Sequence, residues 1–151
     1  MVEAKDRESS RILIIDDDVG HRLIARHALE RAGFTVEEAE DGKQGLLAIK
    51  ETRPDLVLLD IMMPEFNGYD VCVELRRDPE FMNLPIVMVS AIDDIDSVER
   101  AFEAGATNFV TKPVNWIVLY YHVNYILRAN QKTEELHRTK QLLALAHASA
   151  E

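Results

Sequence analysis

The sequence predicts an α/β fold in which a doubly wound, five-stranded parallel sheet is covered by five helices. Short apolar runs alternate five times with longer segments of helical periodicity. Several of the short runs are apolar throughout, which is typical of parallel strands buried on both faces. Five strand-then-helix units connected by right-handed crossovers give such a sheet.

The expected strands are short runs of β-branched and aliphatic residues: Arg11–Asp16, Phe34–Ala39, Leu56–Asp60, Pro85–Ser90 and Thr107–Thr111. The expected helices are Val19–Ala32, Lys43–Glu51, Tyr69–Arg77, Asp94–Ala104 and one that begins after Pro113. Gly33 and Gly105 are suitable stops for the first and fourth helices. Four apolar residues of the first helix are expected to face the core: Leu23, Ile24, Ala28 and Leu29.

The length of 151 residues favours one domain. We expect a flexible or disordered N-terminus over residues 1–10, the domain over 11–128 and a helical linker over 129–151. That last stretch has no glycine or proline. Ala129, Leu136, Leu143 and Ala150 recur every seven residues, but the heptad pattern is weak because Lys132 and Thr139 interrupt its second stripe.

Charge and cysteine content narrow the classes of function. The net charge is −10, which disfavours binding to nucleic acid or to anionic membrane surfaces. Residues 115–151 alone carry +1, so the acidity lies in the preceding part. The single cysteine, Cys72, permits no internal disulfide, and residues 1–10 contain no apolar stretch. We therefore expect a cytoplasmic protein.

Polar residues stand at four expected strand ends. Asp16 and Asp17 end the first strand, Asp60 the third, Ser90 the fourth, and Lys112 follows the fifth. Parallel strands bring these ends to one edge of the sheet.

Three adjacent carboxylates repel one another unless a hard cation binds, and oxygen ligands suit Mg²⁺. We expect Asp17 and Asp60 to be direct ligands, the backbone carbonyl of Met62 a third, and Asp16 to act through a water. Mn²⁺ is expected to substitute.

The same group of residues suits phosphoryl transfer, which needs positioning and charge neutralisation above all. Asp60 is the expected nucleophile, because a carboxylate can form an aspartyl-phosphate. Lys112 would neutralise a phosphate oxygen and Ser90 would donate a hydrogen bond to another. Each feature alone is common in structural roles, but their coincidence at four strand ends favours the functional interpretation.

Four stretches resemble the receiver domains of two-component response regulators: residues 12–17, 55–68, 85–91 and 104–113. The resemblance covers about residues 10–128. It implies a flavodoxin-like strand order of 2-1-3-4-5 and phosphorylation of Asp60 by a sensor histidine kinase or a histidine phosphotransfer protein. The protein would then be no enzyme beyond its own phosphorylation and slow dephosphorylation.

The resemblance also implies a switch. Ser90 and Phe109 would move together, the Lys112–Pro113 bond would be cis, and the fourth helix, fifth strand and fifth helix would present the response. Candidate residues on that surface are Val98, Phe102, Phe109, Trp116 and Tyr120. Residues 111–116 and 125–130 resemble receivers placed ahead of sensory or cyclic-dinucleotide-turnover domains. The C-terminal helix is thus expected to lead to an output domain, a separate partner or a second copy in a homodimer.

Two other functions are weighed against this one. An aspartyl-phosphate phosphohydrolase usually carries a second acid two residues after its nucleophile, and Met62 stands there instead. A phosphate-independent pseudo-receiver would have lost pocket residues, whereas all five are present.

Overall fold

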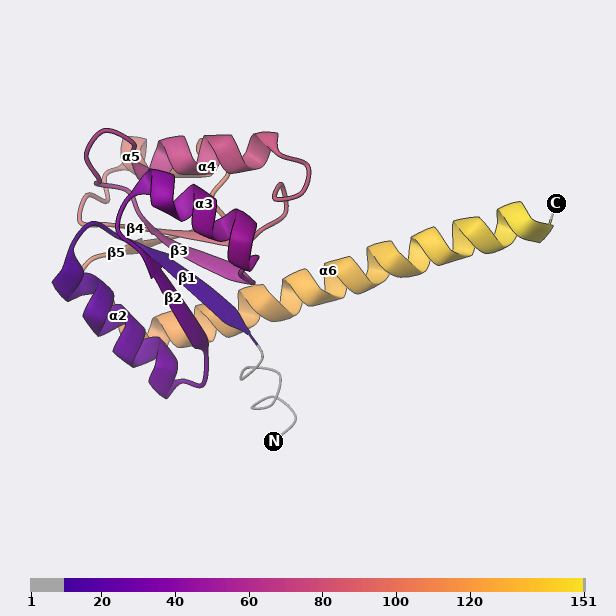
Figure 1. The fold of residues 1–151 in the computed structure, drawn as a ribbon, viewed down its shortest axis with the longest axis horizontal. Coiled ribbons are helices and arrows are strands. Elements are labelled where there is room, and N and C mark those ends of the chain that lie inside the picture. Colours follow the sequence, from indigo (N-terminus) through magenta and orange to yellow (C-terminus); the bar gives the residue numbers. More distant parts are fainter. Residues whose placement is uncertain (1–9, 151) are drawn as a thin grey trace.

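The computed structural model describes residues 10–150 and confirms the predicted fold class (Figure 1). Five parallel strands form one sheet in the order β2-β1-β3-β4-β5. The strands are β1 (Arg11–Ile15), β2 (Thr35–Ala39), β3 (Leu56–Asp60), β4 (Ile86–Ser90) and β5 (Asn108–Thr111). The helices are α2 (Val19–Arg31), α3 (Gly42–Thr52), α4 (Gly68–Arg77), α5 (Ile95–Ala104) and α6 (Trp116–Ala150). The expectation of a flexible N-terminus falls almost wholly on residues 1–9, which lie outside the described residues.

Helices cover both faces of the sheet, as the apolar strands required. Successive residues of a strand point to opposite faces, so alternate positions supply two separate cores. Leu13, Ile15 and Leu59 pack on the side of α3, α4 and α5. Ile14 and Leu58 pack on the side of α2 and α6. Figure 1 shows this division of the helices between the two faces.

The inward face predicted for α2 is only partly right. Leu29 is buried and Ala28 is half-buried, but Leu23 and Ile24 are 67% and 57% exposed. The helix instead turns the face with Ala25 and Leu29 toward the core. This orientation lets Arg22 and Arg26, on the flanks of that face, both reach Glu38. The predicted stripe was wrong because a helix with apolar residues on two sides does not reveal which side meets the sheet.

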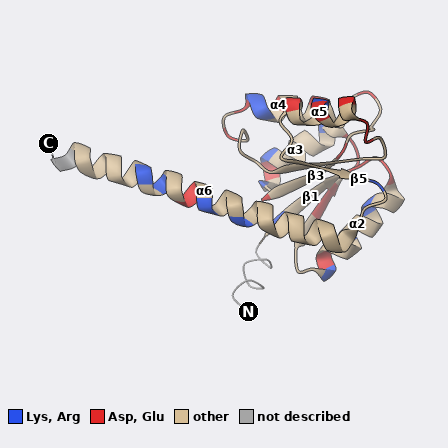
Figure 2. Cartoon of the chain, turned by 180° about the vertical axis from the view of Figure 1, so that it is seen from behind, with Lys and Arg blue, Asp and Glu red and all other residues tan. Residues whose placement is uncertain are grey.

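Helix α6 is one continuous helix whose two halves differ in environment. Its first half packs on the sheet through Leu119, Val123 and Leu127, which are all buried. Every residue from 131 to 148 is exposed, and the helix projects well beyond the domain (Figure 1). Figure 2 shows basic residues spread along α6. Among the described residues, no helix is long and apolar enough to span a bilayer.

Candidate functional site

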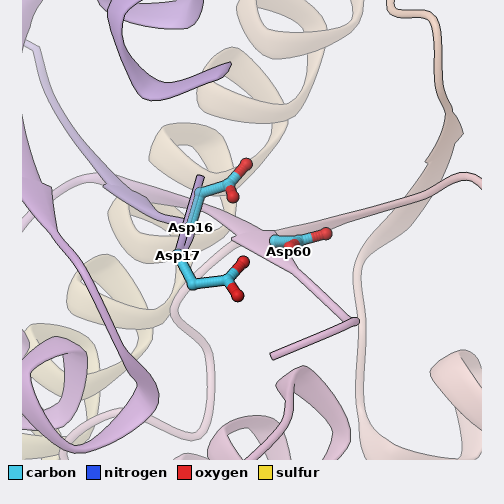
Figure 3. A group of neighbouring side chains, drawn as sticks. All are labelled: Asp16, Asp17 and Asp60. Atoms are coloured by element: carbon cyan, nitrogen blue, oxygen red, sulfur yellow. The ribbon is translucent and has the colours of Figure 1, made fainter. Parts of the chain in front are cut away.

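The carboxyl edge of the sheet gathers three carboxylates from two strands (Figure 3). Asp16 follows the last residue of β1, Asp17 comes next, and Asp60 is the last residue of β3. One oxygen from each of these three side chains lies within 4.8 Å of the others. Asp16 and Asp60 are buried, whereas Asp17 is exposed. The cluster therefore opens to solvent on the side of Asp17.

The segment after β3 holds Asp60 in place. The backbone N–H of Gly68 donates a hydrogen bond to the carbonyl of Ile61. Asn67 and Asp70 form a reciprocal capping box that fixes the start of α4. A Cβ atom at Gly68 would lie 2.7 Å from the carbonyl oxygen of Asp60, so only glycine permits this approach of helix to strand.

Lys112 reaches into the carboxylate cluster from the end of β5. Its Nζ atom lies 3.3 Å from Oδ1 of Asp60 and 3.8 Å from Oδ2 of Asp16. Its backbone N–H donates to the carbonyl of Ser90, and the Lys112–Pro113 peptide bond is cis, as the resemblance implied. One ammonium thus faces three carboxylates, which leaves the pocket with an excess of negative charge.

Burial and the excess negative charge of the pocket together raise the pKa of Asp60 to about 6. Burial is the largest cause, and repulsion by Asp16 is the next. Lys112 lowers the pKa but does not compensate, and Asp17 raises it further. Within the described part of the chain, Oδ1 of Asp60 is a buried side-chain oxygen that accepts no hydrogen bond, although it forms an ion pair with Lys112. A cluster of hard oxygens with an unsatisfied buried acceptor fits the binding of Mg²⁺.

Ser90 and Phe109, the two residues of the expected switch, lie on the neighbouring strands β4 and β5. Ser90 is buried at the end of β4, and its Oγ accepts a hydrogen bond from the backbone N–H of Ile92. Phe109 is half-buried on β5, beside Met88 of β4 in the sheet, and packs on the core shared with α3, α4 and α5. The side chain of Met62 is exposed, and the metal-binding role of its carbonyl stays a prediction.

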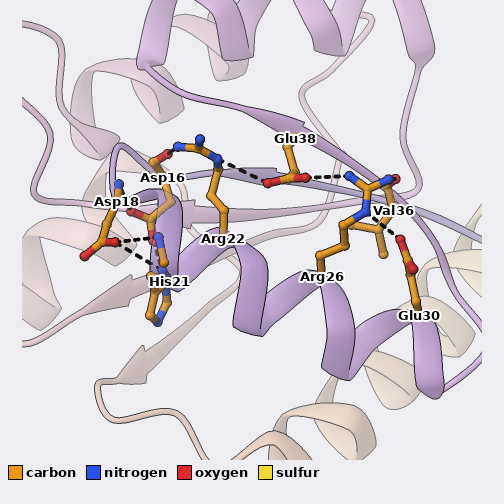
Figure 4. A network of polar contacts seen from close by, with 9 residues as sticks. Asp16, Asp18, His21, Arg22, Arg26, Glu30, Val36 and Glu38 are labelled. Carbon is orange, nitrogen blue, oxygen red and sulfur yellow. Dashed lines mark hydrogen bonds and ion pairs between the residues drawn. The ribbon is translucent and has the colours of Figure 1, made fainter.

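Two residues around Asp16 were missed by the sequence analysis (Figure 4). Nδ1 of His21 lies 2.6 Å from Oδ2 of Asp16, and Nη1 of Arg22 donates to the backbone carbonyl of Asp16 at 2.6 Å. Oδ1 of Asp16 accepts from the backbone N–H of Asp18. Both missed residues lie in the first turn of α2, capped by Asp18. Side chains of a helix lean toward its N-terminus, so residues in the first turn of α2 point back toward Asp16. Their position in that turn was the signal by which the sequence could have identified them.

Comparison with known proteins agrees with this geometry. Residues 12–124 match the model of the response regulator receiver domain family. The chain is 34% identical over 133 residues to the DNA-binding dual master transcriptional regulator RpaA of Synechocystis sp., covering 88% of this chain and 55% of RpaA. It is 41% identical over 126 residues to the DNA-binding response regulator MtrA of Mycolicibacterium smegmatis, covering 83% of this chain and 54% of MtrA. The chain spans about half the length of these curated relatives.

A solved structure shows the same similarity to receiver domains. The crystal structure of the signal receiver domain of a signal transduction histidine kinase from Syntrophus aciditrophicus superimposes with a TM-score of 0.75. The two sequences are 33% identical, and the match covers 80% of this chain and 92% of that one. The similarity therefore extends over the sheet and the helices on both its faces.

Proposed function

We propose, for a chain that belongs to the response regulator receiver domain family, that Asp60 accepts a phosphoryl group in a Mg²⁺-dependent reaction. The donor would be the phosphohistidine of a sensor histidine kinase or a histidine phosphotransfer protein. One observation carries the proposal: the buried Asp60 lies beside two other carboxylates and 3.3 Å from the ammonium of Lys112. Burying several like charges together destabilises a fold, which favours a functional role for this pocket.

Each side chain has a defined part in this proposal. Asp17 and Asp60 would hold the metal directly with the carbonyl of Met62, and Asp16 through a water. When bound, Mg²⁺ would neutralise charge on the carboxylates and on the phosphoryl oxygens. A carboxylate oxygen of Asp60 forms the new bond to phosphorus while the phosphorus–nitrogen bond of the donor breaks, and the electron pair stays on the imidazole. Lys112 pairs with a phosphoryl oxygen.

Phosphorylation would act as a switch because it replaces a carboxylate of charge −1 by an acyl phosphate of about −1.5 to −2, in a pocket that contains one lysine. Ser90 Oγ, which now accepts from Ile92, would turn to donate to the phosphoryl group, and Phe109 would follow inward. The surface formed by α5, β5 and α6 would then change. We propose that this surface and the projecting part of α6 control an output domain, a separate partner or a second copy of the chain.

The test is phosphorylation by a small donor. We expect phosphoramidate with Mg²⁺ to add one phosphoryl group to the wild-type chain, detected by intact mass, and a chelator to abolish the reaction. Asp60→Asn should stay unmodified. Asp55→Asn is the matched control, since Asp55 precedes β3 at its opposite end and is exposed. Equal modification of Asp60→Asn and wild type would contradict the proposal.

A further inference from the structure

His21 lies between the carboxylate cluster and the N-terminal end of α6. On one side its Nδ1 lies 2.6 Å from Oδ2 of Asp16. On the other side its ring centroid lies 6.2 Å from that of Trp116, with the ring planes 42° apart. The His21 side chain is only 20% exposed. Helix α2 thus presents one side chain that contacts both the pocket and the first residue of the projecting helix.

Both carboxylate oxygens of Asp16 have close partners in the protein. Its Oδ1 accepts from the backbone N–H of Asp18, and its Oδ2 faces both His21 and the ammonium of Lys112. An ionised carboxylate only accepts hydrogen bonds, so Nδ1 of His21 carries the proton. Charge-assisted bonds of this kind are short and directional. Any change in the position of Asp16 therefore acts on the imidazole ring.

Resting on the metal-dependent function above, we propose that His21 is a positioning residue that orients Asp16 for Mg²⁺ and couples the pocket to Trp116. Groups that hydrogen-bond to a carboxylate orient it toward a metal, whether it holds the metal directly or, as proposed for Asp16, through a water. Trp116 is half-buried and packs on the same core as Val114 and Tyr120. Movement of the imidazole ring is thus transmitted to Trp116 at the N-terminal end of α6. This route is separate from Ser90 and Phe109, which lie on β4 and β5.

The single tryptophan of the chain makes this coupling measurable, because all tryptophan emission comes from Trp116. We expect Mg²⁺ titrated into the wild-type chain to change that emission with the same midpoint as the heat measured by calorimetry. Heat without a change in emission would overturn the coupling and leave the proposed function intact. A wild-type chain that binds no Mg²⁺ by calorimetry would overturn both.

Two substitutions separate the two contacts of His21. His21→Phe keeps a ring beside Trp116 but removes the hydrogen bond to Asp16, so we expect Mg²⁺ to bind roughly tenfold more weakly. His21→Gln keeps a donor for Asp16 but removes the ring, so we expect Mg²⁺ affinity close to that of wild type. Both should lose most of the emission change, because each breaks one end of the link.

A purely structural role would give a different pattern. It would lower the unfolding temperature of both variants while leaving the emission change and the Mg²⁺ affinity as in wild type, and that result would overturn the proposal. His27→Phe is the matched control, since His27 is an exposed histidine on the same helix. It should behave as wild type in both titrations.

Discussion

The carboxylate pocket and the projecting half of α6 are opposite in construction. The pocket joins residues from the ends of β1, β3, β4 and β5, which lie far apart in the sequence and are mostly buried. In the projecting half, residues 131–148 are all exposed, and a side chain can bond within the helix, as Thr133 Oγ1 does to the carbonyl of Ala129. The pocket thus depends on the whole fold, whereas residues 131–148 bury no side chain in it.

This difference shows where charge and apolar surface matter in the molecule. Repulsion at the pocket costs folding free energy, and in the proposed function it prepares Asp60 for a cation and a phosphoryl group. The exposed leucines of α6, Leu136, Leu142, Leu143 and Leu145, contribute little to the fold of the single chain. Their presence accords with a role for the helix in contacts outside the domain, which we propose and which a measurement of oligomeric state would check.

The largest difference should appear between two leucines of α6. Leu119 is 1% exposed and Leu142 is 63% exposed. We expect Leu119→Ala to lower the free energy of unfolding by about 3 kcal/mol, because it leaves a cavity beneath the sheet. Leu142→Ala should change it by less than about 0.5 kcal/mol. Chemical denaturation of both variants measures this contrast, and similar losses would show that the projecting half is packed in solution.

A smaller loss is expected beside Asp60. Gly68→Ala would place a Cβ atom 2.7 Å from one backbone oxygen and 2.8 Å from the Cα atom of Ile61. We expect a loss of about 2 kcal/mol, since neither backbone atom can move freely. Gly20→Ala is the control, because its Cβ would meet only the flexible side chain of Asp18 at 3.3 Å. Denaturant midpoints that shift equally would contradict the close contact between α4 and β3.

An effect of similar size depends on pH. Burial and Asp16 raise the pKa of Asp60 in the fold to about 6, above its ordinary value of 3.8. When a chelator keeps the protein free of metal ions, ionising Asp60 therefore lowers the free energy of unfolding. This loss is absent below pH 4, grows as the pH rises toward 6, and stays constant above pH 6. Asp60→Asn removes this cost together with the ion pair between Asp60 and Lys112, which keeps its contact with Asp16. The variant should gain about 2 kcal/mol over wild type at pH 8 relative to pH 4, because each unit of the rise in pKa is worth about 1.4 kcal/mol.

Denaturation at the two pH values checks that sign. A variant whose advantage over wild type is the same at pH 4 and pH 8 would show that Asp60 ionises as easily in the fold as in the unfolded chain. Excess Mg²⁺ should reverse the ranking at pH 8, since it stabilises the fold that binds it.

Much of the fold could be predicted because the strands are apolar throughout and end in polar residues. The strand boundaries differ by one residue in places: Asp16 and Phe34 lie just outside β1 and β2. The assembly of Asp16, Asp17, Asp60, Ser90 and Lys112 at one edge follows from the parallel order of the sheet. The roles assigned to these residues stay predictions.

Other features could not be predicted because they depend on how elements pack. The exposure of Leu23 depends on the rotation of α2 about its axis, which two apolar stripes left undecided. His21 and Trp116 lie more than 90 positions apart in the sequence, and only the folded arrangement places them together. The pKa of Asp60 likewise depends on burial, which no spacing of residues reveals.

The central claim is that the repelling carboxylates of the pocket become functional by sharing a divalent cation. Calorimetric titration of Mg²⁺ into wild type and Asp17→Asn tests it most directly, because Asp17 is exposed and its substitution spares the core. We expect a single site in wild type and binding at least about tenfold weaker in the variant, with Asp55→Asn unchanged. Equal affinities for wild type and Asp17→Asn would contradict the account.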